Sequence, residues 1–131
     1  MLTGPNSYGT LRASNVIHAV GPHYMQYTAE EGDALLTSAY TNSLERAREA
    51  GLEAVAFSLL SAGVFRGSRS LREVLRVGVA AMSQFRGYAG LEEVHLCAFN
   101  EREANTLVDI ANEMGLENGG AAESTSACDL I

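Results

Sequence analysis

Three short apolar runs alternate with three helix-like segments along this chain, and this alternation limits its fold more than any other feature of the sequence. The runs cover residues 15–20, 53–60 and 93–99. In the segment after each run, apolar residues recur every three or four positions, as on the buried face of an amphipathic helix. This order predicts an α/β fold with a parallel sheet and right-handed crossovers. The second run is nearly all apolar, which is typical of strands covered on both faces.

Capping residues mark the expected starts of the three helices. Asp33 is placed to cap the first helix. Ser70 and Glu73 fit a capping box, in which each side chain accepts a hydrogen bond from a free backbone N–H near the other residue. Asn100 and Glu103 form a variant of the same box at the third helix.

The chain has 131 residues, of which 47% are apolar and 19% charged, and this is the balance of one soluble globular domain. We divide it into a folded domain over residues 1–115 and a tail over residues 116–131. The tail contains mainly Glu, Asn, Gly, Ala, Ser and Thr. It can bury too little surface to offset its ordering entropy, so it is predicted to be disordered.

Composition also argues against several classes of function. A formal net charge of −7 without a basic run disfavours general nucleic-acid binding. No stretch approaches 18 consecutive apolar residues, and the N-terminus lacks the regions of a signal peptide, so we expect no membrane partner and a cytoplasmic location. Cys97 and Cys128 are isolated, so we expect no disulfide framework and no metal, and we assign no cofactor.

The loop that follows the second apolar run carries the clearest chemical signal. Loops after parallel strands open on one edge of a sheet, where ligands bind. The small residues Ser61, Ala62 and Gly63 let the backbone approach a ligand closely, and several N–H groups ahead of a helix can hold a phosphate. Phe65 can lie across a sugar. Alternatively, the loop is a plain tight turn in which Phe65 covers the core.

Four further side chains each allow more than one interpretation. His18 lies within a predicted strand and is either a core histidine or a catalytic one. His23 follows that strand at the sheet edge and is the histidine to test as a general acid or base. Arg66 either adds a charge-assisted hydrogen bond to a phosphate or is a solvated loop charge. Cys97 is expected to pack in the core rather than to react.

The sequence resembles the macrodomain family in three stretches, namely residues 16–22, residues 39–44 and residues 56–65. These motifs occur in the order of the family, and the resemblance covers about residues 4–115. It implies a three-layer α/β/α fold and recognition of ADP-ribose or of ADP-ribosylated protein. Some members hydrolyse ADP-ribose from proteins, or O-acetyl-ADP-ribose.

The resemblance also implies roles for particular residues. The amides of residues 61–65 would hold the diphosphate, and Phe65 would pack on the distal ribose. Phe99 matches an aromatic residue that stacks on adenine, and Asn100 follows it where a polar residue often lies. The ligand-binding residues implied are therefore Gly21, Pro22, Ser61, Ala62, Gly63, Val64, Phe65, Phe99 and Asn100.

The resemblance begins after the first two strands and the glycine-rich loop of the family. These segments carry groups on which hydrolysis depends, so the resemblance implies a binding module with impaired catalysis and assigns no catalytic residue. An active hydrolase and an interaction remnant without a ligand remain as alternatives. One absent strand is central in the family sheet, so the runs 15–20 and 54–60 would pair directly or another segment would fill the gap. A sheet left open would favour a homodimer.

Overall fold

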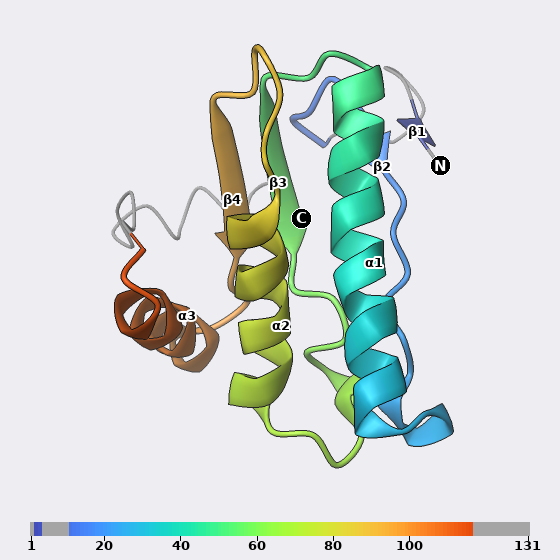
Figure 1. Cartoon of the computed structure of the whole chain (residues 1–131), viewed down its shortest axis with the longest axis vertical. Helices are drawn as coiled ribbons and strands as arrows, with labels where there is room; N and C mark the ends of the chain where they lie inside the picture. The colour runs from blue at the N-terminus through green and yellow to red at the C-terminus, as the bar shows by residue number, and fades with distance from the viewer. Residues whose placement is uncertain (1, 4–10, 117–131) are drawn as a thin grey trace.

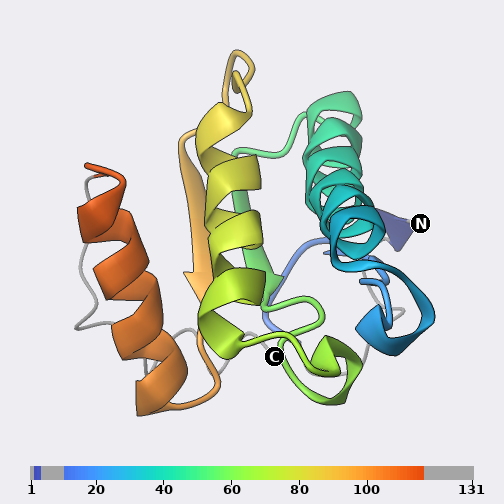
Figure 2. The same cartoon turned by 60° about the horizontal axis from the view of Figure 1, so that its bottom comes forward.

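A computed structural model describes residues 2, 3 and 11–116, so all of the predicted tail except residue 116 lies outside the described residues. The elements are β1 (Leu2–Thr3), β2 (Val16–Ile17), the 3-10 helix η1 (Tyr24–Gln26), α1 (Ala29–Glu49), β3 (Ala54–Ser58), the 3-10 helix η2 (Val64–Arg66), α2 (Leu71–Gln84), β4 (Glu93–Cys97) and α3 (Glu101–Glu113). The helices α1 and α2 stand side by side in front of β3 and β4, and α3 lies on the far side of α2 from α1 (Figures 1 and 2).

The second and third apolar runs form the parallel pair that the sequence predicts. In the β3–β4 pair, Val55 lies opposite Val94, and Phe57 lies opposite Leu96. Val55 and Phe57 are buried, whereas the alternate residues of β3 are exposed. The expectation that this strand is covered on both faces is therefore wrong for the described residues. Its exposed residues, Ala54, Ala56 and Ser58, are small. Exposing the two alanines to water costs little free energy, although both count as apolar in the sequence.

The first apolar run does not join β3 in the described part of the chain. Its strand is only Val16–Ile17, and it pairs antiparallel with β1. Ile17 packs against the main core cluster, but Val20 is 83% exposed. The prediction of a parallel strand over residues 15–20 is wrong because apolar residues that pack on a helix give the same sequence signal as residues in a sheet ladder.

The first helix begins earlier than predicted. Thr28, not Asp33, is its N-cap: the Thr28 hydroxyl accepts a hydrogen bond from the Glu31 N–H at 3.1 Å, and the Glu31 carboxylate accepts one from the Thr28 N–H at 3.2 Å. The caps predicted for α2 and α3 are confirmed, because Ser70 forms a capping box with Glu73 and Asn100 caps α3.

The core lies between the two central helices and the strand pair. Leu36, Tyr40 and Leu44 from α1 are almost fully buried and share one cluster with Val55 and Phe57. A second cluster joins α2 to α3 through Leu75 and Ile110, among others. Of the helices in the described residues, none combines the length and the apolar character that a membrane span requires.

Candidate functional site

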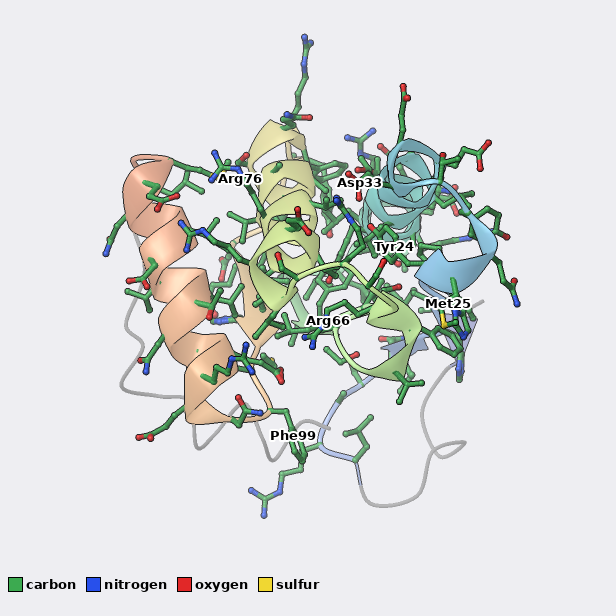
Figure 3. All side chains as sticks on the ribbon, turned by 90° about the horizontal axis from the view of Figure 1, so that it is seen from below. Tyr24, Met25, Asp33, Arg66, Arg76 and Phe99 are labelled. Carbon is green, nitrogen blue, oxygen red and sulfur yellow. The ribbon has the colours of Figure 1, made fainter. Side chains whose placement is uncertain are left out.

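The loops that follow β2 and β3 meet at one edge of the molecule, which Figure 3 shows from below. The contact begins at Ser61, whose hydroxyl donates a 2.7 Å hydrogen bond to the carbonyl oxygen of Pro22. The chain passes so close at Gly21 that a Cβ there would lie 2.3 Å from the Ser61 Oγ. Gly21 and Pro22 are buried and pack against Ser61, at the start of the loop after β3.

Ser61 also has an unusual backbone conformation. Its φ of 57° lies in the left-handed region, and it is the one described residue other than glycine with a positive φ. Such a conformation costs free energy and persists only when the surroundings enforce it. The hydrogen bond to Pro22 is the enforcing contact, and the consequence is a sharp turn of the chain away from β3.

The backbone donors of the following turn have no partners in the part of the chain that the structure describes. Among the described residues, the N–H groups of residues 61 to 65 donate no hydrogen bond. The turn itself is closed by the Arg66 N–H, which donates to the Gly63 carbonyl at 3.0 Å. Gly63 faces open space, since a Cβ there would meet no heavy atom within 4 Å. Successive free N–H groups of this kind suit an anion.

Two aromatic rings lie at the rim of this turn. Phe65 stacks on His23 with ring centroids 4.8 Å apart and an angle of 28° between the planes. Phe65 is 44% exposed and belongs to neither core cluster, so the alternative in which it covers the core is wrong. The His23 Nδ1 accepts a hydrogen bond from the Met25 N–H at 3.4 Å. In the neutral ring the proton is therefore on Nε2, which makes that atom a hydrogen-bond donor.

The surroundings of Arg66 and His18 differ from those that the sequence suggested. Arg66 folds back on the turn, where its Nη1 donates to the Ala62 carbonyl at 3.2 Å (Figure 3). It thus stabilises the turn while leaving a positive charge beside the free amides. His18 is exposed, so the core interpretation of this histidine is wrong. Cys97 is buried, as expected.

Phe99 and Asn100, the site residues predicted after β4, do not become part of this turn. Phe99 is 81% exposed and projects away from Arg66 and Tyr24 (Figure 3). The Asn100 side chain accepts a hydrogen bond from the Glu103 N–H at 2.9 Å, so it acts as a helix cap. Val64 is largely exposed at the tip of the turn.

Comparison with known proteins decides the family. The Macro domain family model matches residues 6–76, more than half of the chain. The chain belongs to the Macro domain family. The resemblance inferred from the three motifs is confirmed, and with it the α/β macrodomain fold.

Relatives of this macrodomain include enzymes of ADP-ribose chemistry. It is 32% identical over 95 residues to an ADP-ribose glycohydrolase of Archaeoglobus fulgidus, which covers 72% of this chain and 48% of that protein. It is 31% identical over 110 residues to an O-acetyl-ADP-ribose deacetylase of Escherichia fergusonii, covering 83% and 60% respectively. The chain therefore spans about half the length of these two relatives.

Solved structures of macrodomains share its fold. A variant of the Oceanobacillus iheyensis macrodomain with ADPR superposes with a TM-score of 0.72 at 26% identity, covering 87% of this chain and 58% of that one. The same macrodomain with MES bound gives a TM-score of 0.67 at 27% identity, covering 78% and 52%.

The turn at residues 61–65 lies apart from two grooves of the macrodomain. The grooves, of about 450 and 200 Å³, lie against α1, one beside α2 and one beside residues 17–20. Neither groove is lined by residues 61–65. The described residues contain no group of His, Cys, Asp and Glu that could hold a metal ion.

The sequence did not predict how three residues near the turn interact. Tyr24, Asp33 and Arg69 form a hydrogen-bonded cluster that links η1, α1 and the loop before α2. No periodicity connects residues 9 and 36 positions apart. The sequence signals only that the Thr28–Glu31 capping box leaves Asp33 without a capping role, and it does not identify the partners of Asp33.

Proposed function

We propose that this macrodomain binds ADP-ribose, free or attached to protein, through the backbone of residues 61–65. The observation that carries the proposal is the row of free N–H groups beside Arg66, in a turn whose residues 63–65 are exposed. A diphosphate would satisfy several of these donors at once. Phe65 would then lie against the distal ribose. The names of the relatives, which act on ADP-ribose or its acetyl ester, support the same ligand.

Calorimetric titration with ADP-ribose tests the proposal. The wild-type protein should release heat, and Gly63→Glu should abolish it, since the new carboxylate occupies and repels the diphosphate position. Gly63→Ala is the matched control: its Cβ meets open space, so its unfolding temperature should equal that of the wild type. Wild-type protein that is folded but gives no heat would contradict the proposal.

We further propose that binding occurs without efficient hydrolysis. His23 is the residue at the rim best suited to act as a base, but within the described residues no carboxylate contacts its ring. A catalytic base is typically oriented by a third group, such as a carboxylate on a histidine. Hydrolase activity is the second candidate, favoured by the named activities of the relatives. Release of acetate from O-acetyl-ADP-ribose by the wild-type protein, lost in His23→Ala, would establish the hydrolase instead.

We also propose a homodimer through the open edge of β3. Within the described residues β3 has one ladder partner, β4, and its outer face exposes Ala54, Ala56 and Ser58. An unpaired strand edge favours pairing with another chain. Light scattering after size-exclusion chromatography should give twice the chain mass, and a monomer over a wide concentration range would contradict the dimer.

A further inference from the structure

A buried side-chain cluster joins the two loops of the proposed site to helix α1. The Tyr24 hydroxyl donates to the Asp33 Oδ1 at 2.7 Å. The Arg69 Nη2 donates to both Asp33 oxygens, at 2.9 and 2.8 Å. The Arg69 guanidinium also lies over the Tyr24 ring, 5.6 Å from its centroid. Asp33 is thus shared by one residue from each loop.

The cluster is largely shielded from water. Tyr24 is 5% exposed, and the Arg69 and Asp33 side chains are 20% and 35% exposed. The Tyr24 ring lies directly on the backbone of α1 at Gly32, where a Cβ would come within 2.5 Å of it. Burial, together with the Asp33 carboxylate, raises the pKa of Tyr24 well above its usual value. Burial is the largest single influence on the pKa of Arg69 and lowers it, but the hydrogen bond to Asp33 and the negative charges of Asp33 and Glu73 act together with Tyr24 to raise the pKa overall.

The residues beside the cluster form the rim of the proposed site. His23, which stacks on Phe65, precedes Tyr24, and Met25, which follows Tyr24, packs against the backbone of Gly67. On the other side, the Arg69 N–H donates to the Arg66 carbonyl at 3.1 Å. A movement of Arg69 relative to Asp33 would therefore act on η2, which follows the turn that carries the free amides.

We propose that Asp33 and Arg69 are positioning residues that hold the turn at residues 61–65 in its ligand-binding geometry. This inference rests on the proposed function, because it concerns how that site is held. The start of α2 is already fixed by the Ser70–Glu73 capping box, so the ion pair is not needed to begin that helix. It fixes instead where the loop before α2 lies relative to α1 and η1. Its loss should affect the ligand more than the fold.

The test compares Asp33→Asn with the wild type in titrations with ADP-ribose and with AMP. AMP keeps one phosphate but lacks the second phosphate and the distal ribose, so it would make only part of the contacts of ADP-ribose with the turn. Removing the charge of Asp33 weakens a charge-assisted hydrogen bond, for which we expect about tenfold weaker binding of ADP-ribose. Binding of AMP should change by less than about twofold, so the preference for ADP-ribose over AMP falls. A merely structural role would weaken both ligands alike.

Three further variants complete the test. Asp33→Glu keeps the carboxylate and should restore most of the affinity. Glu49→Gln removes an exposed ion pair with Arg46 on the same helix and should change nothing. If Asp33→Asn fails to fold, Tyr24→Phe removes only the hydroxyl that donates to Asp33 and keeps the ring in place. This variant should weaken ADP-ribose binding about threefold.

Hydrogen exchange of the ligand-free protein provides an independent readout. In Asp33→Asn, the hydrogen-bonded amides of Arg66, Gly67 and Arg69 should exchange faster, while those of β3 and α3 should not change. Wild-type protein that binds no ADP-ribose would overturn the proposed function itself. If Asp33→Asn binds ADP-ribose as tightly as the wild type does, or loses equal affinity for ADP-ribose and AMP, only the positioning role is overturned.

Discussion

At the scale of single residues, Tyr40 shows how one side chain serves both the core and the site. Its ring packs edge-on against Phe57, with centroids 5.3 Å apart. Its hydroxyl accepts a 2.9 Å hydrogen bond from the Leu60 N–H, one residue before the turn at Ser61. Helical periodicity predicted that Tyr40 is buried. It did not predict the hydrogen bond, because periodicity reports which residues face the core and not what a polar atom there contacts.

Tyr40→Phe should lower the free energy of unfolding by about 1–3 kcal/mol, because the Leu60 N–H then has no acceptor. Chemical denaturation measures the change. Tyr27→Phe alters an exposed tyrosine and should leave the midpoint of chemical denaturation unchanged. Equal midpoints for Tyr40→Phe and the wild type would show that the hydrogen bond contributes nothing.

The same hydroxyl predicts an alkaline decline in stability. Burial raises the pKa of Tyr40 from 10.0 to about 12. The folded state thus keeps a proton that the unfolded state releases. The stabilisation is complete below pH 10 and is lost as the pH rises to about 12, a loss of roughly 3 kcal/mol. Denaturation at several pH values should show a shallower decline in Tyr40→Phe; parallel curves would exclude Tyr40 as the source.

At the scale of elements, helix starts were predictable where a cap lies next to an apolar stripe. Ser70 immediately precedes Leu71, the first residue of α2, which is buried, and that start was predicted correctly. The first residues of α1, Ala29, Glu30 and Glu31, are exposed, and the first buried leucine of its stripe is Leu36. The stripe therefore suggested a start at Asp33. The true cap, Thr28, stands ahead of the apolar pattern and can be found only from its pairing with Glu31.

Thr28→Ala tests the importance of this cap. It removes the oxygen that accepts from the Glu31 N–H, so we expect a loss of about 1 kcal/mol in unfolding free energy. Ser38→Ala, in the exposed middle of α1, provides the matched loss of a hydroxyl. Thermal unfolding of both variants should show a lower midpoint for Thr28→Ala alone. Identical midpoints would mean that tertiary packing, not the cap, sets the start of α1.

At the scale of the whole molecule, the alternation of apolar runs and helices predicted the α/β class and the parallel β3–β4 pair. It did not predict the short antiparallel pair of β1 and β2, because pairing partners depend on contacts between distant residues. The position of the turn at residues 61–65 was predictable, since it follows a buried strand. The cluster of Tyr24, Asp33 and Arg69 was not, because it exists only once three elements have packed together.

The central claim is that backbone amides of one turn bind the diphosphate of ADP-ribose. Following the backbone amide resonances by NMR during titration with ADP-ribose tests it most directly. The amides of residues 61–65 should show the largest chemical-shift changes, and those of α3 should hardly move. The proposal is contradicted if ADP-ribose binds while the resonances of these five amides stay at their ligand-free chemical shifts and those of the groove between α1 and α2 move.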